Sequence, residues 1–162
     1  MNYSKEVHGI AAFIFNENKK CATVEEKEAK PAIRKEKGMF SFPLETSNKE
    51  EKPKKTFERL LYEELGIEKR YIDQGIIKIE IQSIIPIDLR IEHPSGITEI
   101  VTHLFVAKYF GPTNIFLEDD NDVQFHGWMT LEKLYNLPGK ERRIEVRLII
   151  DKVRLIIDKI MS

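Results

Sequence analysis

One short segment, residues 53–65, constrains the fold more than any other part of the chain. Pro53 suits the first turn of an α-helix, and Gly66 follows where a helix would end. The apolar residues between them recur four positions apart, as along one side of a helix: Phe57, Leu61 and Leu65. We therefore expect a helix over residues 53–65 that packs by this stripe against the rest of the protein.

Apolar runs and alternating patterns predict β-strands on both sides of this helix. Residues 7–15 are apolar and rich in β-forming side chains, which predicts a strand buried on both faces. Residues 77–81 and 87–91 alternate isoleucine or leucine with polar residues, as is typical of half-buried strands. A turn at residues 93–96 leads into an opposing strand at 98–109, so we expect a long hairpin.

The C-terminal part of the chain predicts a strand and two helices. After an acidic loop, a strand is expected at 125–129 and a short helix at 131–135, and a longer amphipathic helix is expected over about 140–161. The predicted core-facing seam of the long helix is Val146, Ile149, Val153, Ile156 and Ile160. A terminal helix packed on the domain is the favoured interpretation. Leu148 and Leu155 fall outside the seam, so a helix that forms a homodimer is the alternative.

Length and charge narrow the classes of protein. The 162 residues suit one domain, with a core over about 5–137. A formal net charge of −1 argues against a general nucleic-acid binder, which carries an excess of basic residues. Cys21 is the single cysteine, so no disulfide framework is expected and a reducing cytoplasm is the natural setting. The apolar run at residues 10–15 is too short for a signal peptide or a membrane span.

Acidic residues and one arginine have a characteristic spacing around the predicted helix. Glu51 lies eight residues before Arg59, and the adjacent carboxylates Glu63 and Glu64 follow just ahead of Gly66. Adjacent carboxylates on a rigid helix beside a loop suit a hard divalent cation that holds phosphates. A solvated helix end is the alternative interpretation, in which the arginine pairs weakly with a carboxylate and the glycine only caps the helix.

This segment resembles a degenerate Nudix box. That motif runs Gly, five residues, Glu, seven residues, then Arg-Glu-hydrophobic-any-Glu-Glu-any-Gly-hydrophobic, and a Phe-Pro pair often leads into it. The matching positions are Phe42, Pro43, Glu51, Arg59, Leu61, Glu63, Glu64, Gly66 and Ile67. The buried first strand and the acidic loop before Trp128 extend the likeness over roughly residues 5–137.

Two residues depart from the motif at positions that matter for chemistry. Leu60 stands where the motif has a glutamate, one helical turn from Glu63 and Glu64, so the missing carboxylate belongs to the same patch. We therefore expect the substitution Leu60→Glu to raise metal affinity. Glu45 stands where the motif has a glycine, and a glutamate there strains any backbone conformation with positive φ. The same side chain is also a candidate for returning a carboxylate to the metal.

The resemblance implies a fold and an activity. The implied fold is α+β, with a mixed, curved β-sheet sandwiched between α-helices. The implied function is a Nudix-type hydrolase that cleaves a diphosphate linkage in a nucleoside diphosphate derivative with Mg²⁺ or Mn²⁺. Glu63 and Glu64 would hold the metal, with Glu64 also catalytic, and Arg59 would orient the loop through Glu51. In the acidic loop, Asp122 is the preferred candidate for a catalytic base among Glu118, Asp119, Asp120 and Asp122.

Other classes of function stay open at the level of the sequence. A binding or regulatory domain that kept the pocket and lost turnover is the main alternative, because Leu60 cannot coordinate a cation. A structural dimer module built on the C-terminal helix is a third. Nucleotide affinity without turnover would indicate the binding or regulatory domain. Absence of both affinity and turnover would indicate the structural dimer module.

Overall fold

Strands form the centre of the molecule and helices cover them. The computed structural model describes residues 3–26, 38–113, 123–142 and 144–162. The strands are β1 (Tyr3–Phe15), β2 (Lys20–Glu26), β3 (Phe40–Ser41), β4 (Leu44–Thr46), β5 (Lys78–His93), β6 (Gly96–Phe110) and β7 (Val123–Thr130). The helices are α1 (Pro53–Leu65), α2 (Lys69–Asp73), α3 (Leu131–Tyr135) and α4 (Ile144–Met161).

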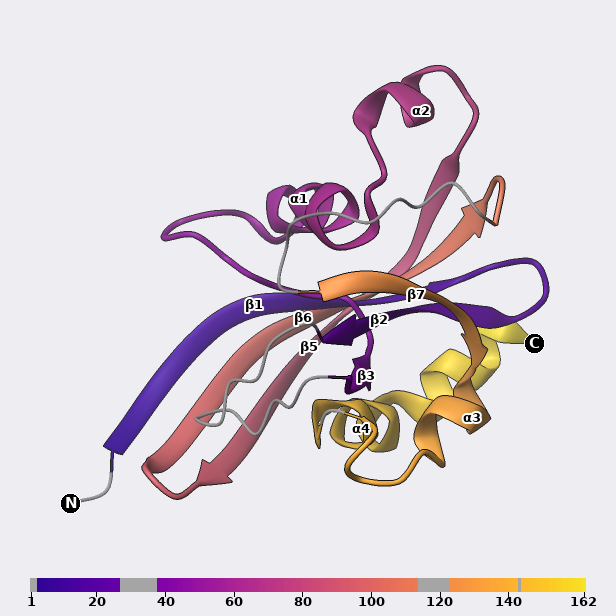
Figure 1. Cartoon of the computed structure of the whole chain (residues 1–162). Helices are drawn as coiled ribbons and strands as arrows, with labels where there is room; N and C mark the ends of the chain where they lie inside the picture. The colour runs from indigo at the N-terminus through magenta and orange to yellow at the C-terminus, as the bar shows by residue number, and fades with distance from the viewer. Residues whose placement is uncertain (1–2, 27–37, 114–122, 143) are drawn as a thin grey trace.

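The sheet is mixed, and a parallel pair lies at its middle. β1 runs parallel to β6 over its whole length, from Tyr3 opposite Gly96 to Phe15 opposite Lys108. The strand order is β3-β2-β1-β6-β5, with β4 on β1 and β7 on β2, and Figure 1 shows the strong curvature of the long strands. β5 forms one edge, where Pro86 is tolerated because an edge strand has one side without a ladder partner.

The predicted hairpin is confirmed and is longer than expected. β5 and β6 pair antiparallel from Lys78 opposite Phe110 to His93 opposite Gly96. The two alternating segments expected on the first strand form one continuous strand. An irregularity between Ile81 and Ser83 shifts the alternation and makes the sequence look like two pieces.

Successive side chains of β1 point to opposite faces of the sheet and enter two separate cores. Ile10, Ala12 and Ile14 pack in one cluster with the apolar side of α1. The other core also contains apolar residues of α4, and its β1 members are Ala11, Phe13 and Phe15. Figure 1 shows α1 and α2 on one side of the sheet and α3 and α4 on the other. The expected sandwich of a mixed sheet between helices is therefore confirmed.

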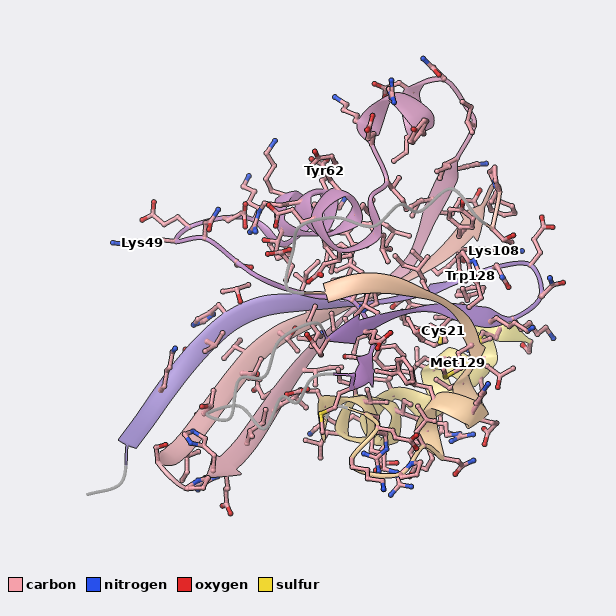
Figure 2. The ribbon with its side chains drawn as sticks, viewed as in Figure 1. Cys21, Lys49, Tyr62, Lys108, Trp128 and Met129 are labelled. Carbon is pink, nitrogen blue, oxygen red and sulfur yellow. The ribbon has the colours of Figure 1, made fainter. Side chains whose placement is uncertain are left out.

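Helix α1 begins and ends where the sequence predicts. Gly66 adopts a left-handed backbone with φ of 70°, and its N–H donates to Tyr62 O while Ile67 N–H donates to Leu61 O. These two bonds close the helix as a Schellman motif. Leu60 joins the expected stripe as a fully buried residue, whereas Tyr62 projects from the helix into solvent (Figure 2).

Helix α4 is present as expected, but one residue of its predicted seam is wrong. Ile156 is 43% exposed, and its neighbour Ile157 is fully buried, as is Ile150. Each Leu-Ile-Ile triplet offers adjacent apolar positions, so periodicity alone fixed the buried face only to within one residue. Leu148 packs partly against the core, while Leu155 is 86% exposed.

The sequence did not predict three short elements, β3, β4 and α2. β3 and β4 have only two and three residues, too few for a visible alternation. In the part of the chain that the structure describes, no helix is long and apolar enough to cross a membrane.

Candidate functional site

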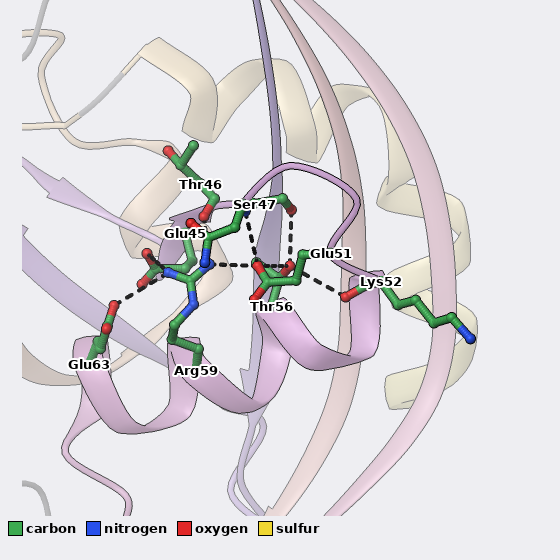
Figure 3. Close-up of polar contacts among 9 residues, drawn as sticks. Glu45, Thr46, Ser47, Glu51, Lys52, Thr56, Arg59 and Glu63 are labelled. Atoms are coloured by element: carbon green, nitrogen blue, oxygen red, sulfur yellow. Dashed lines mark hydrogen bonds and ion pairs between the residues drawn. The ribbon is translucent and has the colours of Figure 1, made fainter.

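One arginine from the middle of α1 ties the helix to the segment that precedes it. Arg59 Nη1 donates to Glu45 Oε1 at 2.7 Å, and Nη2 donates to Glu51 Oε1 at 2.6 Å and to Thr46 O at 2.8 Å. Nη1 also lies 3.6 Å from Glu63 Oε2, one helical turn further along α1. Figure 3 shows these partners gathered around the guanidinium. The geometry therefore places three carboxylates around a single cation.

The loop between β4 and α1 is ordered around the carboxylate of Glu51. Besides Arg59, the N–H of Asn48 donates to Glu51 Oε1 at 3.1 Å, and Thr56 Oγ1 donates to the same oxygen at 2.8 Å (Figure 3). These donors stabilise the ionised form. The hydrogen bond from Arg59, followed by those from Asn48 and Thr56, lowers the pKa of Glu51 to about 2. Ser47 Oγ lies 3.0 Å from Thr56 Oγ1 and adds a further contact between loop and helix.

Glu45 shares the same guanidinium but titrates in the opposite direction. Its side chain is only 14% exposed. Burial, then a hydrogen bond with Glu63, then repulsion by the Glu63 charge raise the pKa of Glu45 to about 7, although Arg59 opposes the shift. Near neutral pH the carboxyl group of Glu45 is therefore partly protonated.

The position of Glu45 follows from strand β4. β4 pairs antiparallel with β1, with Thr46 opposite Gly9 and Glu45 opposite Ile10. A Cβ at Gly9 would lie 2.6 Å from the carbonyl oxygen of Glu45, so glycine is what allows this close approach. The expected backbone strain at Glu45 is wrong, because the residue is in a strand. The non-glycine residue of this region with positive φ is Glu50, at 65°.

A cavity of about 960 Å³ opens beside these residues. Glu45, Glu51 and Glu64 contribute to one part of its wall. Two further glutamates that line it, Glu26 and Glu145, are almost completely buried. Its size is that of a pocket for a small organic ligand.

The structure brings together most of the predicted site residues. Arg59, Glu51 and Glu63 are in mutual contact through the guanidinium, and Glu64 lies at the cavity. Leu60, one helical turn before Glu64, is fully buried in the core cluster with Phe57, Leu61 and Leu65. Asp122 and its acidic neighbours Glu118, Asp119 and Asp120 lie outside the described residues.

Two residues that contribute to the site, Ser47 and Thr56, were not predicted from the sequence. A hydroxyl residue in the first turn of a helix was the only available signal, and it usually indicates local capping. Within the described ranges, no group of three histidine, cysteine, aspartate or glutamate side chains is close enough together to hold a metal ion by itself.

Comparison with solved structures identifies the fold. The MutT protein from Methanosarcina mazei Go1 superposes with a TM-score of 0.63 at 15% identity, over 96% of this chain and 98% of that one. A Nudix hydrolase from Nitrosomonas europaea gives a TM-score of 0.63 at 17% identity, over 93% and 90%. The Nudix domain of Shewanella oneidensis NrtR, in complex with ADP-ribose, gives 0.57 at 16% identity, over 95% and 90%. The chain therefore has the fold of the Nudix hydrolases.

Comparison at the level of sequence adds no relative. No protein-family model matches the chain, and no curated protein matches it.

Proposed function

We propose that this protein is a Nudix-type hydrolase that cleaves a diphosphate linkage in a nucleoside diphosphate derivative. The observation that carries the proposal is the cluster around Arg59, where Glu45, Glu51 and Glu63 converge beside a cavity of about 960 Å³. The shared fold supports it, as does the ADP-ribose bound by the NrtR Nudix domain.

The proposal assigns a divalent cation to carboxylates of α1, with waters and substrate phosphates as its remaining ligands. Glu45, Glu51 and Glu63 surround the single positive charge of Arg59, and Glu45 among them is partly protonated near neutral pH. Carboxylate oxygens are the donors that Mg²⁺ and Mn²⁺ prefer. In the proposal Glu63 and Glu64 hold Mg²⁺ or Mn²⁺. When bound, that ion would neutralise the diphosphate and activate water as a nucleophile.

The side chains of the chain itself would divide the remaining work. Arg59 binds Glu51 and the carbonyl of Thr46, and so fixes the loop against α1. Glu64 lies at the cavity wall, where its carboxylate would accept a proton from the attacking water. Asp122, the candidate for the base that was preferred from the sequence, lies outside the described residues and stays the alternative to Glu64.

A hydrolysis assay tests the proposal. The protein is incubated with ADP-ribose and a panel of other nucleoside diphosphate derivatives with Mg²⁺ or Mn²⁺, and nucleotide or phosphate release is followed. We expect turnover by the wild type and a loss of about 10²- to 10⁴-fold in Glu64→Gln, the range for a removed general base.

Glu58→Gln is the matched control, because Glu58 is on the same helix and its side chain is 71% exposed. Its activity should equal that of the wild type. No turnover of any compound by the wild type, or full activity of Glu64→Gln, would overturn the proposal.

A nucleotide-binding or regulatory domain without catalysis is the second candidate function. The fully buried Leu60, at a position where the Nudix box has a glutamate, favours it. Calorimetry with the same panel separates the two functions, since this candidate predicts affinity for a nucleotide without its hydrolysis. For either function a reducing cytoplasm is the proposed setting, in which Cys21 stays a free and buried thiol.

A further inference from the structure

One buried hydroxyl in the first turn of α1 contacts the loop that forms a wall of the cavity. Thr56 is fully buried, and its Oγ1 donates to Glu51 Oε1 at 2.8 Å and lies 3.0 Å from Ser47 Oγ (Figure 3). The carbonyl oxygen of Lys52 is a further neighbour, at 3.4 Å. Ser47 and Glu51 both line the cavity. Thr56 therefore joins the helix to two residues of the cavity wall.

The hydrogen bonds of Thr56 have a direction, because its hydroxyl has one proton to donate. The ionised carboxylate of Glu51 and the carbonyl of Lys52 can only accept. The carboxylate is both closer and charged, so the proton of Thr56 goes to Glu51. Thr56 Oγ1 is then the acceptor toward Ser47, whose hydroxyl donates. One chain of hydrogen bonds therefore runs from the loop through the helix and back to the loop.

The loop contains a backbone conformation that its surroundings have to hold in place. Glu50 has a φ of 65°, in the left-handed region that glutamate rarely adopts, and such a residue persists where neighbouring contacts determine it. The next residue, Glu51, accepts hydrogen bonds from Arg59 and Thr56. It also accepts one from the N–H of Asn48, within the loop. The carboxylate of Glu51 is therefore the point at which the helix fixes the loop.

We propose that Thr56 is a positioning residue for the proposed reaction, because its hydroxyl fixes the loop of residues 47–51 as the cavity wall that faces the substrate. The inference rests on the proposed function and adds to it a residue outside the matching positions of the Nudix box. Thr56 and Arg59 are neighbours one turn apart on α1. Two donors in a fixed arrangement therefore set the orientation of one carboxylate.

Amide hydrogen exchange, followed by NMR, tests the proposal without measuring activity. The reporter is the N–H of Asn48, which donates to Glu51, in the full-length wild type, Thr56→Val and Thr56→Ser. Valine removes the hydroxyl and keeps the branched shape. We expect exchange about 10- to 100-fold faster in Thr56→Val, the range for a lost hydrogen bond to a charged group, and the wild-type rate in Thr56→Ser. The N–H of Ile67, at the other end of α1, should keep its rate, whereas a general loosening of the helix would speed both.

Binding of a nucleotide in the presence of Mg²⁺ measures the consequence for the site. The probe in calorimetry is ADP-ribose, or the member of the hydrolysis panel that the wild type binds most tightly. We expect Thr56→Val to bind it about 10-fold more weakly or worse, and Thr56→Ser to bind it as the wild type does. Thr130→Val is the matched control, since Thr130 caps α3 and is not among the residues that line this cavity. Its affinity and its exchange rate at Asn48 should equal those of the wild type.

A wild-type rate at Asn48 in Thr56→Val, or equal acceleration at Asn48 and Ile67, would overturn the proposal and leave the proposed hydrolase intact. Faster exchange at Asn48 with unchanged nucleotide affinity would overturn it as well, because the ordered loop would then not serve the site. Absence of nucleotide binding and turnover in the wild type would instead overturn the proposed function, and the positioning role with it.

Discussion

At the scale of single residues, two glutamates on one guanidinium show how neighbours decide ionisation. Glu51 accepts hydrogen bonds from Arg59, Asn48 and Thr56, which favour its charged form. Glu45 has Arg59 as well, but burial and the adjacent Glu63 favour its neutral form. The pKa values of the two glutamates therefore shift in opposite directions beside the same cation, because the other contacts of Glu51 favour its charged form and those of Glu45 favour its neutral form.

These shifts predict an optimum of stability in weakly acidic solution. The pKa of Glu45 rises from 4.5 to about 7 on folding, so between these values the folded state binds more protons and the free energy of unfolding falls as pH rises. The pKa of Glu51 falls from 4.5 to about 2, so its contribution is present above pH 4.5 and is lost as pH falls toward 2. Urea denaturation from about pH 3 to about pH 8 measures the profile.

Glu45→Gln should remove the decrease between pH 4.5 and 7, because the amide does not ionise. Arg59 and Glu63, the charged groups that face residue 45, stay in place in this variant. A wild-type profile that is parallel to that of Glu45→Gln over this interval would contradict the prediction.

At the scale of elements, helix α1 separates an apolar side from a charged side. Leu60 lies on the apolar side, so Leu60→Glu would bury a carboxylate among core residues and not restore the motif. We now expect this substitution to lower the free energy of unfolding by at least about 2 kcal/mol. Leu60→Met, which conserves volume, should cost less than about 1.5 kcal/mol. Urea denaturation measures both. Wild-type stability of Leu60→Glu together with tighter Mn²⁺ binding would show that residue 60 reaches the site.

Helices and strands were predicted well from the sequence where helix-ending or turn-forming residues mark their limits. Pro53 and Gly66 fixed the limits of α1, and the turn at residues 93–96 fixed the β5–β6 hairpin. In α4 no such signal separated Ile156 from Ile157, since both fit an amphipathic helix. Element type followed from local pattern, whereas the buried face depended on packing against the sheet.

The candidate site was predicted only in part, for a related reason. The spacing of Glu51, Arg59 and Glu63 indicated a shared site because the helix brings the last two together and the arginine reaches the loop. The position of Glu45 in the site depends on pairing between β4 and β1, which joins segments distant in sequence. No local pattern predicts such pairing for a strand of three residues.

At the scale of the whole molecule, α4 covers one face of the sheet and keeps one large apolar side chain outside. Leu155 is 86% exposed, whereas Leu148 packs partly against the core. Of the two leucines that suggested a dimer helix, one is therefore used within the protomer. We expect a monomer in sedimentation velocity, with the same sedimentation coefficient for the wild type and Leu155→Asp. A wild-type dimer that Leu155→Asp dissociates would establish the alternative.

The parallel pairing of β1 with β6 has a consequence for synthesis on the ribosome. β1 leaves the exit tunnel well before its parallel partner β6, which extends to Lys108, opposite Phe15. Until those later residues emerge, β1 has only β2 and β4 as pairing partners, and the β6 side of the sheet is missing. We therefore expect the parallel pair to form late in folding, because it joins segments that are distant in sequence.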